Sequence, residues 1–230
     1  MQFTFLSRIN SKIHRLKGTT IIQFGPPRSG TTLIYNILKD IFLDRFVETR
    51  HYYRDKDKKF PTVVTYRNPL DSILSHIMIA QRHKIRNFNT ESLKKNIHNS
   101  LIDAAIKTFE GNGINDIVKL KNNNNVLMLK YEKFFNNFEY IYQKLEIFFN
   151  KEIDINTRNL IKKTYCIDSV DKITKQYKSY SEIDNNTLFH GDHININKGE
   201  PGFYKIYFRE EQIEYLKNIY KNFITNFNYS

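Results

Sequence analysis

Residues 19–32 read TTIIQFGPPRSGTT, and this stretch decides the fold. Its first six residues form a short apolar run with β-branched side chains, which predicts a buried strand. A turn rich in Gly, Pro and Ser follows at 25–30. Apolar residues then recur at helical spacing, at Leu33, Ile34, Ile37, Leu38 and Ile41. A strand, a glycine-rich turn and a helix in this order form the unit from which parallel α/β sheets are built.

The rest of the chain repeats this alternation. Further strands are predicted at 45–51, 62–66 and 126–129, and helices from residue 70, over 93–109, over 138–149 and from 210 to about 223. The pattern predicts a three-layer α/β/α domain with a central, mainly parallel sheet, similar to the P-loop NTPases. No internal repeat or linker divides the sequence, so we expect one domain over residues 1–230, with 1–18 as a polar leader.

The charge balance is strongly basic, and it favours anionic partners. The chain has 230 residues with 36 Lys+Arg against 24 Asp+Glu, a formal net charge of +12. Such a charge suits a polyphosphate, a nucleic acid or a sulfated sugar equally well, so motifs must distinguish them. Hydrophobic residues make up 40% of the chain and aromatic residues 14%, which argues against global disorder.

The cysteine count and residues 1–17 indicate where in the cell the protein is expected. The lone Cys166 excludes a disulfide within one chain and a cysteine-based zinc site. Arg8, Lys12, Arg15 and Lys17 interrupt the apolar residues of 1–17, so we expect neither a signal peptide nor a membrane span. We therefore expect a soluble, cytoplasmic protein. No metal is expected either, because no pair of histidines has metal-ligand spacing with acidic or cysteine partners.

The turn from Gly25 to Gly30 has the GxxxxG spacing of a phosphate-binding loop. Such a loop directs backbone N–H groups at an anion, and the helix dipole adds positive potential. Ser29, Thr31 and Thr32 can add hydroxyl donors. A triphosphatase would carry Lys at the position of Thr31. Because Arg28 is the only cation of the loop, an anion shorter than a triphosphate is indicated; a capped strand-to-helix turn is the alternative.

A second segment, residues 65–75 (TYRNPLDSILS), places Arg67 at the carboxyl end of a predicted strand and Ser75 on the following helix. Ligands of open parallel sheets bind outside the carboxyl ends of the strands. Arg67 and the glycine loop can therefore face one crevice. An arginine suits a phosphate there because its guanidinium forms charge-assisted, often bidentate hydrogen bonds.

Together, PPRSGTTL at 26–33 and RNPLDSILS at 67–75 resemble the two nucleotide-binding signatures of the sulfotransferases that use 3′-phosphoadenosine 5′-phosphosulfate (PAPS) and release 3′-phosphoadenosine 5′-phosphate (PAP). The resemblance implies sulfuryl transfer to a hydroxyl or amine. It implies that the loop from Arg28 to Thr32, including Gly30, holds the 5′-phosphosulfate. Arg67 and Ser75 would hold the 3′-phosphate.

Two later segments fit the same family. Residues 126–149 resemble its strand, Tyr-Glu turn and helix, which makes Tyr131 a candidate neighbour of the adenine, or else an ordinary half-buried tyrosine. Residues 197–202 (NKGEPG) resemble its late loop over the 3′-phosphate, with Lys198 and Gly199 in place. Asn197 stands where cytosolic members carry Arg, so one phosphate contact is expected to be weaker or to be supplied by Lys198 or a nearby residue.

The resemblance also implies how the reaction is catalysed. Arg28 would stabilise the bridging and sulfuryl oxygens, and a base would accept the proton of the acceptor. The family places that base on or just after the second strand, where this chain offers Glu48 and His51. Imidazole exchanges protons near neutral pH, which favours His51. Residues three apart on a strand face opposite sides, so only one of the two can face the crevice.

Other functions remain open at this stage. A P-loop kinase or nucleotide hydrolase with a degenerate loop is one alternative, and a non-enzymatic polyanion-binding module is the other; specific nucleic-acid binding is not expected. The acceptor is not indicated, whether a small alcohol, a lipid, a sugar or a peptide tyrosine. Its specificity is expected to reside in 93–121 and 153–196, and His190 and His193 could approach the site.

Overall fold

A parallel sheet forms the centre of the computed structural model, which describes residues 12–82, 90–111, 113–191, 194 and 196–229. Four strands pair in the order β2-β1-β3-β4, and every pair is parallel. Their bounds are Thr20–Phe24 (β1), Phe46–Arg50 (β2), Thr62–Tyr66 (β3) and Val126–Lys130 (β4). The parallel sheet and all four predicted strands are thus confirmed.

Alternation along each strand divides the apolar residues between two cores. Ile21 and Val63 face one core, called the first core below, while their neighbours Ile22 and Val64 face the other, called the second core. Successive side chains of a strand point to opposite faces, so a sheet covered on both sides reads as a continuous apolar run. The predicted layers, helix on sheet on helix, follow from this pattern.

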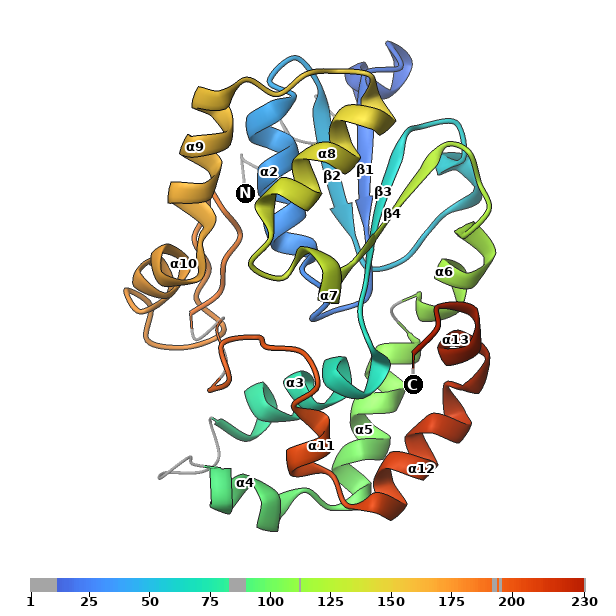
Figure 1. Cartoon of the computed structure of the whole chain (residues 1–230), viewed down its shortest axis with the longest axis vertical. Helices are drawn as coiled ribbons and strands as arrows, with labels where there is room; N and C mark the ends of the chain where they lie inside the picture. Colours follow the sequence, from blue (N-terminus) through green and yellow to red (C-terminus); the bar gives the residue numbers. More distant parts are fainter. Residues whose placement is uncertain (1–11, 83–89, 112, 192–193, 195, 230) are drawn as a thin grey trace.

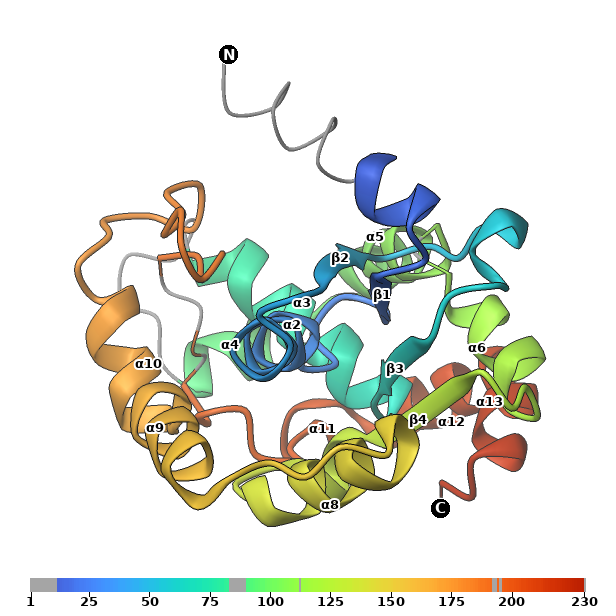
Figure 2. The ribbon, with the colours of Figure 1, turned by 90° about the horizontal axis from the view of Figure 1, so that it is seen from above.

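The helices of the first core include α2 and its neighbours, and Figure 1 shows two of them, α9 and α10, at the left. They are α2 (Thr31–Ile41), α8 (Phe138–Phe149), α9 (Ile155–Tyr165) and α10 (Ile167–Thr174), with the short α7 (Tyr131–Phe134) directly after β4. The hydroxyl of Tyr165 donates to Asp40 Oδ2 over 2.8 Å and joins α9 to α2. Seen from above, α8 and α9 lie along the same side of the molecule (Figure 2).

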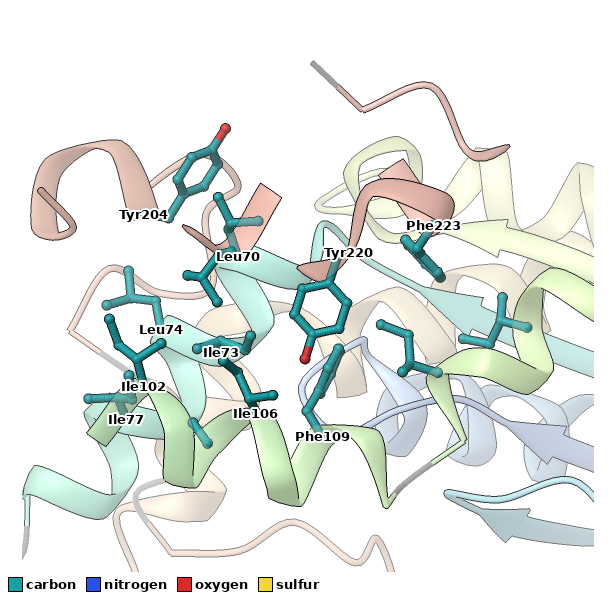
Figure 3. Close-up of a cluster of buried hydrophobic side chains, with 14 of the residues drawn as sticks. Leu70, Ile73, Leu74, Ile77, Ile102, Ile106, Phe109, Tyr204, Tyr220 and Phe223 are labelled. Atoms are coloured by element: carbon teal, nitrogen blue, oxygen red, sulfur yellow. The ribbon is translucent and has the colours of Figure 1, made fainter. Parts of the chain in front are cut away.

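The second core is built by helices that gather in the lower half of Figure 1, with α6 at mid-height on the right. They are α3 (Pro69–Arg82), α4 (Thr90–Asn96), α5 (Asn99–Glu110), α6 (Ile114–Leu120), α11 (Tyr204–Tyr207), α12 (Glu210–Ile219) and α13 (Lys221–Asn226). Figure 3 shows side chains of α3 and α5 interleaving, with Tyr220 and Phe223 closing the cluster. The C-terminal helices therefore belong to the same core as the sheet.

Two predicted helices are interrupted in the structure. The stretch 93–109 covers the end of α4 and most of α5, because His98 has an extended backbone (φ −94°, ψ 158°) and separates the two helices. The closing helix divides at Tyr220 (φ −97°, ψ 18°) into α12 and α13. Near both breaks, residues such as Ile97 and Phe223 are buried in the second core. Tertiary packing therefore overrides the helical spacing of apolar residues that predicted one continuous helix in each stretch.

Residues 12–16 of the predicted leader form a helical turn, and residues 1–11 lie outside the described part of the chain. A short 3₁₀ turn, η1 (Asp55–Asp57), precedes β3. Within the described ranges no helix is long and apolar enough to cross a membrane.

The strand order creates a switch point in the sheet. From β1 the chain moves to β2 on one side, and it then returns across β1 to β3 on the other. Ligands of open α/β sheets bind in the crevice at the carboxyl ends of strands beside such a point. The glycine loop follows β1 and Arg67 follows β3, so the fold brings both motifs to this crevice.

Candidate functional site

A cavity of about 190 Å³ opens at the carboxyl ends of the strands. It is lined by predicted site residues from both motifs, the residue after β2, α7 and the late loop, namely Arg28, Gly30, Thr31, Thr32, His51, Arg67, Tyr131, Lys198 and Gly199. An apolar wall from the other segments completes it, including Phe134, Phe138, Tyr165, Ile167, Val170, Phe189 and Ile194. Segments far apart in sequence therefore meet in one concave site.

The glycine loop is shaped by its two glycines. A Cβ on Gly25 would lie 2.3 Å from Thr65 Oγ1 and 2.6 Å from its carbonyl oxygen, so only glycine lets the loop approach β3 this closely. Gly30 has a φ of +83° and is the N-cap residue directly before α2. Thr31, Thr32 and Leu33 line the cavity, so the first turn of α2, whose N–H groups have no partner within the helix, lies where an anion-binding loop holds its anion.

Ser29 plays a different part from the one its position suggests. Its side chain is fully buried, and its Oγ donates to the Pro26 carbonyl over 2.7 Å and lies 3.0 Å from Thr65 Oγ1. Ser29 is not among the residues that line the cavity. Its hydroxyl thus fastens the loop to β3, and the hydroxyls of Thr31 and Thr32 are the ones placed at the cavity.

Arg28 reaches across the crevice to the second motif. Its backbone has a φ of +68°, in the left-handed region, and its Nε donates to Ser75 Oγ over 3.0 Å. Burial, and to a lesser degree the nearby charge of Arg67, lowers the pKa of Arg28. A guanidinium still remains charged at neutral pH, so the environment favours an anion beside it. Ser75 itself is buried behind Arg28.

Arg67 lies at the end of β3 with only 3% of its surface exposed. Its guanidinium stacks 4.2 Å from the centre of the Tyr131 ring, and its Nη2 donates to the carbonyls of Gly199 (3.0 Å) and Glu200 (3.1 Å). Its buried Nε has no hydrogen-bond partner in the described part of the chain. A buried donor without a partner is costly and suits an anionic ligand.

The late loop is held from both sides by the motifs it covers. The hydroxyl of Tyr131 donates to the Gly199 carbonyl over 2.9 Å, next to the bonds from Arg67. At the other end, the Asp71 carboxylate accepts from the backbone N–H groups of Gly202 (2.7 Å) and Tyr204 (3.2 Å). Burial nevertheless raises the pKa of Asp71. Asp71, which sequence reasoning did not single out, thus links α3 to the loop.

The two candidate bases lie in different surroundings. His51 lines the cavity, and its Nδ1 lies 2.8 Å from the Gly25 carbonyl. A carbonyl only accepts, so Nδ1 carries the proton and the lone pair of the neutral ring sits on Nε2. Glu48 is absent from the cavity wall. Its carboxylate binds Arg15 Nε (2.7 Å) and Arg50, on the other side of β2.

Four of the other histidines are candidates for a place near the site or on the surface, and they fall into three cases. His76 is half-buried on α3, and burial together with the Arg28 charge lowers its pKa. His190 lines the cavity, whereas His83 and His193 lie outside the described residues. No group of three His, Cys, Asp or Glu side chains that could hold a metal ion occurs in the described ranges.

Among the polar side chains of the cavity that sequence reasoning missed is that of Tyr180. It lies in a segment with no recognisable motif, about 150 positions from Arg28 in the chain, and no local pattern distinguishes it from the other tyrosines. Only the packing of residues 177–191 against α2 brings it to the glycine loop.

Comparison with known proteins agrees with this geometry. A search of curated proteins found no match. Among solved structures, mouse sulfotransferase SULT7A1 complexed with PAP is similar, with a TM-score of 0.65, 15% identity, and 93% of this chain and 90% of that chain covered. Retinol dehydratase in complex with androsterone and inactive cofactor PAP follows, with a TM-score of 0.59, 12% identity, and 90% and 81% covered. These likenesses confirm the P-loop NTPase-like fold.

The sequence itself carries the family assignment. Residues 53–228 match the model of the sulfotransferase domain, a span of more than half of the chain that includes Arg67, Ser75, Tyr131 and the late loop. The glycine loop precedes this span, and the structure places it at the same cavity. Because the matched residues and the loop build one site on the expected fold, the chain belongs to the sulfotransferase domain family.

Proposed function

We propose that this protein transfers a sulfuryl group from PAPS to a hydroxyl or amine of an acceptor and releases PAP. The observation that carries the proposal is the convergence of Arg28 and the first turn of α2 with Arg67, Tyr131 and the late loop on one cavity. Two separate cationic positions suit a nucleotide with separate 3′- and 5′-anionic groups.

The donor would lie across the switch point. The N–H groups of α2, with Thr31, Thr32 and Arg28, would hold its 5′-phosphosulfate. The buried Nε of Arg67 would bind the 3′-phosphate, with Ser75, Lys198 and Gly199 near it, and Tyr131 would lie by the adenine. At about 190 Å³ the cavity is smaller than the 300–1,000 Å³ usual for ligand sites, so the late loop would move outward as the nucleotide enters.

The chemistry then needs positioning and charge stabilisation. The acceptor oxygen would attack sulfur, the bond from sulfur to the phosphate oxygen would break, and negative charge would build on the departing PAP. Arg28 would stabilise that charge. His51 Nε2 would take the proton of the acceptor hydroxyl, since its Nδ1 proton is engaged with Gly25. No step in this scheme uses a metal.

Calorimetry with PAP tests the proposal. The unaltered protein should bind PAP, and Arg67→Ala should weaken binding by at least tenfold, because one charge-assisted contact is lost. Arg209→Ala is the matched control, since Arg209 lies on the surface at the start of α12 and pairs with Glu211. PAP binding that neither Arg67→Ala nor Arg28→Ala weakens would contradict the proposed site.

Activity provides the second test. Incubation with ³⁵S-labelled PAPS and pools of small alcohols, lipids, sugars and tyrosine peptides should yield a labelled product in at least one pool. The apolar wall of Phe138, Ile167 and Val170 favours the less polar pools. Magnesium-dependent ATP turnover that survives Arg67→Ala would instead identify a kinase or nucleotide hydrolase.

A further inference from the structure

Tyr180 and His190 form a rigid pair on the cavity wall. Their rings stack with centres 4.3 Å apart and an interplanar angle of 8°. His190 Nδ1 lies 2.8 Å from the backbone carbonyl of Tyr180, and because a carbonyl accepts, this nitrogen donates. The imidazole is thus tied to the residue on which it stacks. Both residues line the same cavity as Arg28.

The loop that carries this pair is itself fixed. Asp184 accepts hydrogen bonds from the backbone N–H groups of Asn186 (3.1 Å) and Thr187 (2.7 Å), and Ile183 pairs with His190 in an antiparallel bridge. Buried Asn36 of α2 donates to the Thr187 carbonyl over 2.6 Å. The helix that follows the glycine loop, α2, therefore also helps to position the segment that carries Tyr180 and His190.

Tyr180 lies beside Arg28 on the cavity wall, and the interaction of its hydroxyl with the guanidinium raises the pKa of Arg28, against the larger lowering by burial. A guanidinium has donors only, so the Tyr180 oxygen must accept. The proton of that hydroxyl is then directed away from Arg28. An anion that Arg28 binds in the cavity would be an acceptor for this proton.

We propose that Tyr180 is a further donor-binding residue, which donates its hydroxyl hydrogen bond to the anionic group held by Arg28 while His190 fixes the ring. This inference rests on the proposed function and deepens it. The ligand chemistry is a tetrahedral anion, the 5′-phosphate of PAP or the sulfuryl oxygens of PAPS. Arg28 and Tyr180 would form a pair of donors that binds the anion together with the N–H groups of α2.

Two nucleotides distinguish a contact of Tyr180 with the 5′-phosphate from a general effect of Tyr180 on nucleotide binding. PAP carries both phosphates, whereas 3′-AMP lacks the 5′-phosphate, so the ratio of their Kd values measures what the 5′-phosphate contributes. Tyr180→Phe keeps the stacked ring and removes only the hydroxyl. It should weaken PAP binding about tenfold, the usual effect of losing a hydrogen bond to a charged group, and leave 3′-AMP binding within about twofold.

Tyr177→Phe is the matched control in the same loop. It also removes one hydroxyl, which donates to Asp184 Oδ2 over 2.9 Å, but Tyr177 does not line the cavity. It should leave both Kd values unchanged, and melting temperatures should show that both variants are folded. His190→Ala should weaken PAP binding as well, while His190→Phe, which restores a flat ring, should recover most of it.

The outcomes separate the two proposals. Loss of PAP affinity in Tyr180→Phe with 3′-AMP binding retained supports the role of Tyr180. Unchanged PAP binding, an equal loss for both nucleotides, or an unaltered protein that binds PAP no better than 3′-AMP overturns it, even though the proposed function survives. If the unaltered protein binds neither nucleotide, the proposed function fails and the role of Tyr180 fails with it.

Discussion

Arg28 Nε donates a hydrogen bond to Ser75 Oγ over 3.0 Å, so the glycine loop and the second motif are in direct contact across the crevice. The resemblance to sulfotransferases assigns these two residues to opposite ends of the nucleotide. In the structure they form one unit, in which Ser75 orients the guanidinium. Changes at the 3′-phosphate side are therefore expected to alter the 5′ side as well.

This contact predicts that the two residues are energetically coupled. Ser75→Ala and Arg28→Ala should each weaken PAP binding, and the double variant should lose about 1 kcal/mol less than the sum, because the shared hydrogen bond is removed only once. Calorimetry on the four proteins measures the coupling. Additive losses would show that the two side chains act independently.

Removing the Tyr131 hydroxyl should loosen the late loop. Tyr131→Phe takes away one of the bonds to the Gly199 carbonyl and keeps the ring on which Arg67 stacks. Trypsin should then cleave after Lys198 faster than in the unaltered protein, since exposed and less anchored backbone is cut first. PAP should protect both proteins. Equal cleavage rates would mean that Arg67 and Asp71 suffice to hold the loop.

Replacing His51 should affect the chemical step more than donor binding. His51→Gln removes the Nε2 lone pair from the cavity, so the rate of sulfuryl transfer to the acceptor found in the ³⁵S screen should fall by about 10²- to 10⁴-fold. The Kd for PAP should stay within about threefold. A large loss of PAP affinity with little change in rate would assign His51 to binding instead.

Glu48 should behave in the opposite way. It binds Arg15 and Arg50, and those arginines also pair with the fully buried Asp57. Glu48→Gln leaves these cations short of a partner and should lower the free energy of unfolding by about 2 kcal/mol, while the transfer rate per folded molecule stays unchanged. Chemical denaturation and the ³⁵S assay measure the two effects. A rate loss in a stable variant would make Glu48 the base.

The His76 environment predicts a pH dependence of stability. Burial, and then the Arg28 charge, lowers the pKa of His76 below its ordinary value of 6.5. Between the lowered pKa and 6.5 the unfolded chain binds more protons than the folded one, so the free energy of unfolding rises with pH in this window and levels off above it. His76→Gln should flatten that rise in urea unfolding measured from pH 5 to 8. An unchanged slope would refute the assignment.

Much of the fold follows from local pattern. The apolar runs and the turns that bound them specify the four strands, and the parallel sheet follows from helices between them. The sequence also identifies the cationic positions, since Arg28 and Arg67 stand in motifs whose spacing carries a physical reason. The interruption of the 93–109 helix at His98 was not predictable, because it depends on the packing of Ile97 and its neighbours into a core assembled from distant segments.

What the sequence alone determined is the class of the protein, because the loop spacing and the Arg67 motif act through backbone geometry and charge that are local to each segment. Tertiary structure decided how the side chains are used. Ser29 turns inward because Thr65 offers it partners, and Glu48 is engaged because Arg15 from the leader reaches it. Tyr180 reaches Arg28 only because α2 anchors its loop. Contacts between segments far apart in sequence leave no local signal, so only the folded chain reveals them.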